Sequence, residues 1–207
     1  MPALAFKLYY SPGACALASH IALEESGAAF ELQKVDLRQG EQKAPEFLAI
    51  NPAGSTPALV TDEGVLTENL VIMAWVARGA PHLTPEPDSF AFAKMQSFNG
   101  FLGSSLHPAI SRVLFARPPL EGEARAAAVE VAMSKYHLVE DAFFNGPWVM
   151  GESYTVADGY LYVFCRWVKA AGLLDADRFP KLNAHIARMQ ERPAVQRALA
   201  AEGIPAV

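Results

Sequence analysis

Cys15 stands where a thiol could become reactive. The residues before it, Tyr10-Ser11-Pro12-Gly13-Ala14, predict the end of a strand, a turn and the start of a helix. In the first turn of a helix, unpaired backbone N–H groups and the helix dipole stabilise a thiolate, so they would lower the pKa of the thiol. The alternative is a small core residue, as a lone cysteine most often is. Cys165 lies within an apolar helical face and is expected in a core.

A second candidate site is the segment Gly54-Ser55-Thr56-Pro57, directly before a predicted strand. A cis bond before Pro57 would leave the backbone N–H and C=O of Thr56 available to a peptide-like ligand. The alternative is an ordinary trans proline at the start of a strand, and the spacing alone does not separate the two.

The third candidate is Leu66-Thr67-Glu68-Asn69, at the start of a predicted helix. A helix N-terminus offers backbone N–H groups to a carboxylate, and Thr67 or Asn69 could cap it. Glu68 could accept the ammonium group of a ligand. Taken alone, this segment is also consistent with a plain helix cap.

The elements that must position these segments follow a recognisable order. Hydrophobic periodicity and turn residues predict strands at 5–10, 30–37, 58–61 and 65–67 and helices at 14–26, 45–50 and 68–78. The order β-α-β-α-β-β-α is that of a thioredoxin-like domain, which we place at residues 1–80.

The rest of the chain predicts helices only. Residues 81–88 contain three prolines and predict a linker, and residues 89–207 predict an all-helical domain. Its helices are expected at 89–117, at 120–145, from 155 onward and at 180–192. The fold class is therefore an α/β thioredoxin-like domain followed by a helical bundle.

Composition narrows the possible functions. The net charge of −5 argues against a nucleic-acid partner, and no apolar run is long enough to span a membrane. Residues 1–8 lack the pattern of a signal peptide, so we expect a cytoplasmic protein. Two cysteines suggest a reducing compartment, although Cys15 and Cys165 could in principle bridge each other. No His/Cys cluster has metal-ligand spacing, so no metal is expected.

Taken together, the three segments resemble the glutathione S-transferase superfamily over essentially the whole chain. The opening Lys7 to Cys15 is similar to that of the bacterial beta class, whose active-site cysteine falls where Cys15 stands. Ile50 to Leu59 resembles the cis-proline loop of the family, and Leu66 to Asn69 resembles its Glu-Ser turn. Asp158, in Thr155-Val156-Ala157-Asp158, resembles the capping box of the helical domain.

This resemblance implies roles for particular residues. Glutathione would be the co-substrate, held by Ser55, Thr56, Pro57, Glu68, Asn69 and Ser104. His107 matches the beta-class histidine that approaches the active-site cysteine, where an imidazolium would stabilise the thiolate; a plain surface histidine is the alternative. Tyr10 and Ser11 are candidates for a hydrogen bond to the sulfur. A homodimer is also implied.

Two reactions fit such a site. Glutathione could attack a hydrophobic electrophile and form a thioether, or Cys15 could exchange with disulfides as a glutaredoxin does. A cysteine at this position favours the exchange, and conjugation is expected to be the weaker activity. A non-catalytic regulatory module and a glutathione-dependent isomerase or dehalogenase are the alternatives. Phe101, Leu114, Phe115 and Trp167 could line the pocket for an apolar acceptor, or could simply be core.

Three departures from the family pattern are visible. Asn69 replaces the usual Ser or Gly after the acidic residue, and Pro108 stands after His107 where a basic residue can occur. The loop 38–43 does not align with the lysine-bearing loop that often contacts glutathione, and Lys43 is only a guess for that contact.

Overall fold

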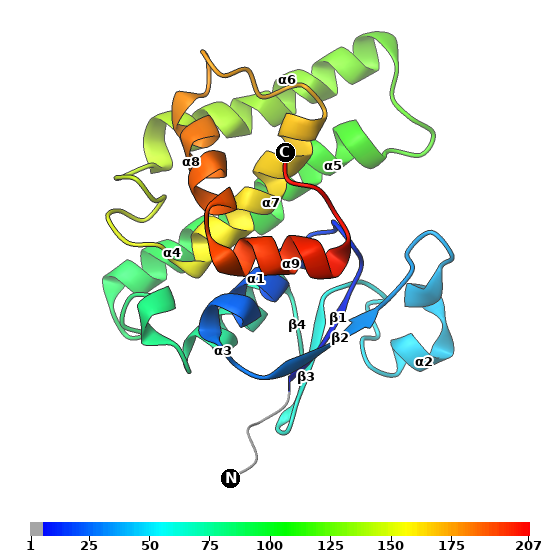
Figure 1. Cartoon of the computed structure of the whole chain (residues 1–207). Helices are drawn as coiled ribbons and strands as arrows, with labels where there is room; N and C mark the ends of the chain where they lie inside the picture. Colours follow the sequence, from blue (N-terminus) through cyan, green and yellow to red (C-terminus); the bar gives the residue numbers. More distant parts are fainter. Residues whose placement is uncertain (1–5) are drawn as a thin grey trace. The chain divides into compact units, whose positions relative to one another are not determined.

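The computed structural model describes residues 6–207. Residues 1–5 lie outside it, and with them lie part of the segment examined for a signal peptide and the first residue of the strand predicted at 5–10. The chain forms two compact units (Figure 1). The first comprises the chain up to Thr84 together with Gln190–Ala206, and the second comprises Pro85–Met189 with Val207. The domain boundaries drawn from the sequence stay a prediction.

The first unit contains one mixed sheet of four strands in the order β2-β1-β3-β4 (Figure 1). Its strands are β1 (Phe6–Tyr10), β2 (Phe30–Lys34), β3 (Ala58–Thr61) and β4 (Gly64–Thr67). Strand β1 pairs in parallel with β2 and antiparallel with β3, and β3 forms a hairpin with β4. Helices α1 (Leu17–Ser26) and α2 (Pro45–Leu48) lie between the strands, and α3 (Asn69–Ala77) follows β4; short 3-10 turns occur at Glu41–Lys43 and Pro81–Leu83. The predicted thioredoxin-like order is confirmed.

The two faces of this sheet are covered differently because side chains alternate along a strand. Leu8 and Leu59 lie opposite each other on β1 and β3, and both are fully buried. Their face packs with α1 and α3, of which Leu17, Ile21, Ile72 and Met73 are also fully buried. Tyr9 points to the other face, where its ring meets Phe47 of α2 at 5.9 Å. The sheet therefore holds the loop after β1 and the start of α3 on one scaffold.

Among the described residues of the second unit, the regular secondary structure is helical, apart from an isolated bridge between Trp148 and Gly151. Its helices are α4 (Phe90–Phe101), α5 (His107–Phe115), α6 (Gly122–Leu138), α7 (Val156–Ala170) and α8 (Pro180–Gln190), with π-helical turns at Leu102–Leu106 and Val139–Phe143. The predicted helix at 89–117 is thus one run of α4, a π-turn and α5.

Helix α7 forms the centre of the second unit, and nearly all of its side chains are buried. The predicted capping box starts it: the Asp158 carboxylate accepts the Thr155 N–H at 2.9 Å. The same carboxylate also accepts the Val149 N–H at 2.9 Å and meets His185 Nε2 at 3.2 Å. One buried carboxylate therefore ties the start of α7 to α8 and to the preceding loop.

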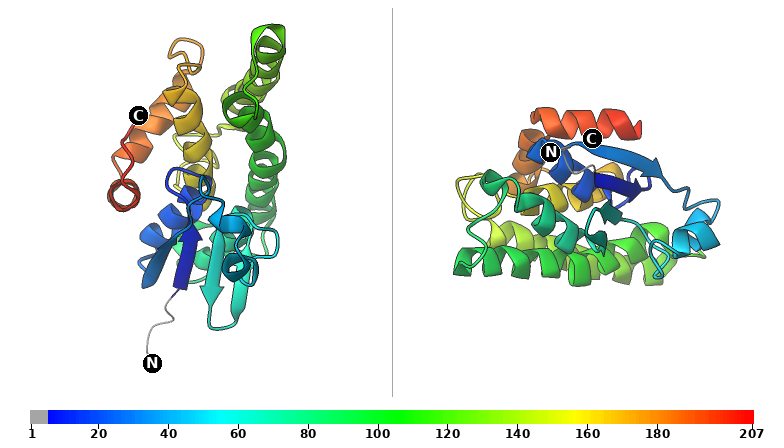
Figure 2. Two further views of the ribbon diagram at one scale, coloured as in Figure 1. Left: turned by 90° about the vertical axis from the view of Figure 1, so that its right-hand side faces the viewer. Right: turned by 90° about the horizontal axis from the view of Figure 1, so that it is seen from below.

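A helix that the sequence analysis did not identify, α9 (Pro193–Glu202), closes the chain. It packs against α1 and belongs to the first unit (Figure 2). Pro193 at its first turn and the left-handed Gly203 at its end are ordinary start and stop signals. Among residues 6–207, no helix has both the length and the apolar character needed to cross a bilayer.

Candidate active site

Cys15 lies in the turn between β1 and α1, two residues before the helix begins, and so slightly earlier than the predicted first helical turn. Gly13 supplies the left-handed backbone of this turn, with φ of 70°. The Gly13 N–H donates to a carboxylate oxygen of Glu202 in α9 at 2.8 Å. The Cys15 thiol donates to the backbone carbonyl of Thr56 at 3.7 Å. The turn thus brings two of the predicted site segments together.

The predicted lowering of the Cys15 pKa is wrong for the protein without ligand. Burial of the sulfur raises the pKa to about 11, and the negative charge of Glu68 adds to this effect. Hydrogen bonds from the Asn69 side chain and from the backbone N–H groups of Cys15 and Ala16 act in the opposite direction. The expected backbone donors are therefore present, but they do not outweigh the loss of hydration.

The loop before β3 has the predicted cis bond between Thr56 and Pro57. Asn51, which is buried, spans this loop: its Nδ2 donates to the Ser55 carbonyl at 2.7 Å and its Oδ1 accepts the Ala53 N–H at 3.1 Å. The sequence analysis did not single out Asn51, although an Asn-Pro pair is a turn signal that could have drawn attention to it. Ser55 is exposed and Thr56 is partly exposed, so both can meet a ligand.

Lys43 supports the same loop from the other side. Its amine donates to the Ala53 carbonyl at 3.3 Å. A Cβ atom built on Gly54, where φ is 59°, would lie 2.6 Å from that amine. Lys43 is exposed, and its charge therefore stands beside the loop that carries Ser55 and Thr56.

Glu68 caps α3 in a conformation that non-glycine residues rarely adopt, with φ of 68°. Its carbonyl accepts the N–H groups of Val71 and Ile72 at 3.0 Å each, and its side chain is exposed. A strained residue of this kind persists only where the surrounding structure fixes it, and such residues cluster at functional sites.

Asn69, next to Glu68, is buried instead of lying open at the helix end. Its Oδ1 accepts the hydroxyl of Ser19 in α1 at 2.7 Å. A hydrogen bond from its side chain is one of the effects that lower the pKa of Cys15. Ser19 is fully buried and was not singled out from the sequence. Its role depends on a contact between residues far apart in the chain, which no local pattern reveals.

Tyr10 and Ser11 differ in their surroundings. Tyr10 is buried, and its ring lies 6.0 Å from that of His20. Burial raises the pKa of Tyr10, and Glu202 raises it further. Ser11 is partly exposed in the turn before Cys15. Their predicted hydrogen bonds to the reacting sulfur stay predictions.

His107 opens α5 in the second unit, directly after the π-turn that contains the exposed Ser104. Its ring lies 5.1 Å from Phe164 and 5.4 Å from Trp167, and Trp167 in turn meets the exposed ring of Phe115 at 5.2 Å. Burial lowers the pKa of His107, so the imidazole is neutral at pH 7 and not the expected imidazolium. Its approach to Cys15 and the binding role of Ser104 stay predictions.

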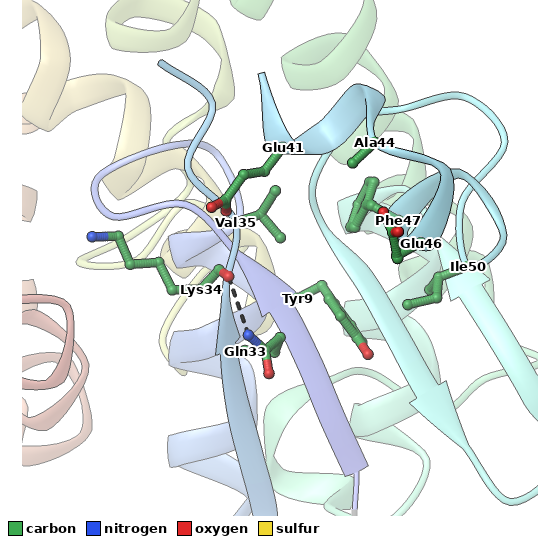
Figure 3. Close-up of a pocket in the computed structure, with 9 residues that line it drawn as sticks. All are labelled: Tyr9, Gln33, Lys34, Val35, Glu41, Ala44, Glu46, Phe47 and Ile50. Atoms are coloured by element: carbon green, nitrogen blue, oxygen red, sulfur yellow. Dashed lines mark hydrogen bonds between the residues drawn. The ribbon is translucent and has the colours of Figure 1, made fainter. Parts of the chain in front are cut away.

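A separate groove of about 360 Å³ lies beside β1, β2 and α2 in the first unit (Figure 3). Tyr9, Phe47 and Ile50 give it an apolar wall, while Lys34 and Glu46 contribute opposite charges. None of the predicted site residues lines it. Within residues 6–207, no group of three or more potential ligand side chains could hold a metal ion.

Comparison with known proteins identifies the family of this chain. Models of the glutathione S-transferase N-terminal and C-terminal domains match residues 4–78 and 105–202. This protein belongs to the glutathione S-transferase superfamily. It is therefore a glutathione transferase, as the sequence predicted.

Individual relatives cover nearly the whole chain. A glutathione S-transferase GstA from Escherichia coli O157:H7 is 36% identical over 96% of this chain and 99% of its own. The solved beta-class enzyme of Sphingomonas chungbukensis is 37% identical, with a TM-score of 0.85, over 96% of this chain and all of its own. A sphingomonad glutathione S-transferase complexed with glutathione is 40% identical, with a TM-score of 0.86 over the same shares. The predicted similarity to the bacterial beta class is confirmed.

Proposed function

We propose that the protein binds glutathione as its co-substrate at Cys15, Thr56 and Glu68. The observation that carries this proposal is the hydrogen bond from the Cys15 thiol to the Thr56 carbonyl, which joins the nucleophile loop to the loop expected to pair with the tripeptide. A relative that is 40% identical holds glutathione in its solved structure. Glu68 would receive the γ-glutamyl ammonium group, and the exposed Ser55 and Lys43 would face the rest of the tripeptide.

Because the pKa of Cys15 is high when no ligand is bound, the site favours conjugation over thiol-disulfide exchange. At pH 7 a thiol with a pKa of about 11 is ionised in only about one molecule in ten thousand. Once the thiol of bound glutathione has lost its proton to solvent, a neutral Cys15 can donate its S–H to the glutathione sulfur and stabilise that thiolate. The glutathione thiolate then attacks an electrophilic carbon, the leaving group departs with the bonding electrons, and a thioether forms.

Thiol-disulfide exchange stays a second candidate because three donors already point at the Cys15 sulfur. In this reaction the Cys15 thiolate attacks one sulfur of oxidised glutathione. A mixed disulfide forms, and the other glutathione leaves as a thiolate. An ammonium group bound at Glu68 would cancel the charge that raises the Cys15 pKa, so glutathione itself would promote this step.

Because its imidazole is neutral, His107 fits a role as hydrogen-bond acceptor for a thiol proton better than a role as a positive charge beside the Cys15 thiolate. We also propose a homodimer, which the family resemblance implies.

The test compares two activities in the wild type, Cys15→Ala and the control Cys165→Ala. Conjugation is measured with 1-chloro-2,4-dinitrobenzene, and exchange is measured as the mass of a glutathione adduct formed with oxidised glutathione. We expect conjugation to fall at least about 10-fold in Cys15→Ala and not in the control. An adduct on Cys15 near neutral pH would establish exchange as well. Wild-type protein that does not bind glutathione in calorimetry would overturn the proposal.

A further inference from the structure

The hydrogen bond between Ser19 and Asn69 joins two helices beneath the reactive sulfur. Ser19 in α1 is fully buried, and Asn69 at the start of α3 is only 4% exposed. The Ser19 hydroxyl donates to Asn69 Oδ1 at 2.7 Å, a short contact between neutral groups that are 50 residues apart in sequence. Two buried polar side chains at a helix-to-helix contact need such a partner, so the bond also contributes to packing.

This bond determines which way the Asn69 amide faces. An asparagine side chain carries its acceptor oxygen and its two donor hydrogens on opposite edges of one plane. Because Ser19 occupies the oxygen edge, the NH₂ edge keeps its donors for another partner, and a hydrogen bond from the Asn69 side chain is one of the effects that favour the Cys15 thiolate. Ser19 follows Cys15 by four residues, which places both on the same side of α1 and its preceding turn.

We propose that Asn69 is a hydrogen-bond donor to the reacting sulfur of Cys15 and that Ser19 is the positioning residue that holds its amide in this orientation. The inference deepens the proposed function, on which it rests, because it assigns roles at the same site. It also revises the expectation that Asn69 holds glutathione directly. The carboxylate of the γ-glutamyl group would instead meet the backbone N–H groups at the start of α3.

A donor fixed in this way serves either reaction. While Cys15 is a thiol, Asn69 keeps the sulfur oriented toward the Thr56 carbonyl, to which the thiol donates. When the proton leaves, the N–H bond stabilises the thiolate, since hydrogen bonds to charged groups are stronger than those between neutral groups. Without Ser19 the amide can rotate, and the donor would face the sulfur for only part of the time.

The experiment measures the alkylation of Cys15 by iodoacetamide from pH 6 to pH 10 without glutathione, with the modified residue identified by mass spectrometry. We expect Asn69→Ala to slow alkylation at pH 8 about 10-fold, because the thiolate loses one donor. Ser19→Ala should slow it about 3-fold, and the double variant should match Asn69→Ala alone. Ser26→Ala removes a hydroxyl that bonds the Leu23 carbonyl at the far end of α1, and it should leave the profile unchanged.

A role in packing alone predicts a different result. Ser19→Ala would then lower the melting temperature and leave the pH profile of alkylation where it is in the wild type, which would overturn the proposal. A further slowing by Ser19→Ala in the Asn69→Ala background would overturn it too, because Ser19 would then act without Asn69. If Asn69→Ala does not fold, Asn69→Leu removes the donor while keeping the volume of the side chain, and it gives the same comparison. Because the assay contains no glutathione, a failure of the proposed function appears separately, as loss of glutathione binding by the wild type.

Discussion

The reactivity of Cys15 depends on local effects that shift its pKa in opposite directions. Its sulfur has the donors that a nucleophilic cysteine needs, but burial and the carboxylate of Glu68 oppose the thiolate. Of these, the charge of Glu68 is the one that a substrate can change, because an ammonium group bound there would neutralise it. Glu68 would thus link glutathione binding to the ionisation of Cys15.

Replacing Glu68 tests this link at the level of one residue. In Glu68→Gln the negative charge disappears, the thiolate is less disfavoured, and the Cys15 pKa should fall from about 11. Alkylation of Cys15 at pH 8 should then be about 3- to 10-fold faster than in the wild type. The affinity for glutathione should decrease in the same variant because the ammonium group loses its partner. Glu63→Gln, an exposed carboxylate in the turn between β3 and β4, is the control; equal alkylation rates in all three proteins would disprove the link.

The residues of the site were predictable from sequence to different extents. Cys15, the cis bond at Pro57 and the cap at Glu68 each follow a turn or a helix start, and such local signals are visible in a single sequence. The direction of the Cys15 pKa shift was not predictable, because desolvation depends on side chains that the fold brings around the sulfur. Ser19 and Asn69 meet across 50 residues, and no local pattern indicates that contact.

At the level of elements, the last helix carries a carboxylate into the loop of the nucleophile. Glu202 of α9 is buried, and its two oxygens receive the Gly13 N–H at 2.8 Å and contact His20 Nδ1 at 2.9 Å. Arg192, the residue directly before α9, also connects this helix to α1, because its guanidinium donates twice to Glu25. The position of the Cys15 turn therefore depends on residues at the opposite end of the chain.

Removing the Glu202 carboxylate should destabilise the first unit. Glu202→Ala leaves the Gly13 N–H and His20 without their buried partner, and we expect the free energy of unfolding to fall by about 3 kcal/mol. Urea unfolding at pH 7 measures this loss. Arg197→Ala is the matched control, because it breaks an exposed ion pair between the same two helices and should cost less than about 1 kcal/mol. Equal losses in the two variants would mean that α9 contributes only generic packing.

The elements before residue 190 followed from the sequence more readily than α9 did. The sheet of the first unit and the long helices of the second have strong periodicity, clear turns and recognisable caps, and the structure confirms them. Helix α9 is short and directly follows α8 after two residues. It belongs to the first unit because it contacts α1, a helix that lies far away in the sequence.

For the whole molecule, buried thiols predict a specific sensitivity to alkaline pH. Cys15 and Cys165 are both free, and burial raises the pKa of each, with Glu140 adding to the effect at Cys165. In the unfolded chain both thiols would ionise near their ordinary value of about 9. The folded protein keeps these protons at higher pH, so it binds more protons than the unfolded chain does in that range.

The direction in which stability changes with pH follows from this difference in bound protons. The stability that the protonated thiols contribute is complete below about pH 9 and is lost as the pH rises through the higher folded values, by about 1.4 kcal/mol per pH unit for each thiol. Urea unfolding at pH 8, 9 and 10, with a reductant present, should therefore show a steady fall in the free energy of unfolding. Cys165→Ala is less stable at pH 8 because it leaves a cavity, but its stability should fall less steeply with pH, by the share of one thiol. Parallel pH dependences in the two proteins would show that Cys165 ionises alike in both states, and the alkaline sensitivity would then have to come from Cys15 or from buried tyrosines such as Tyr136.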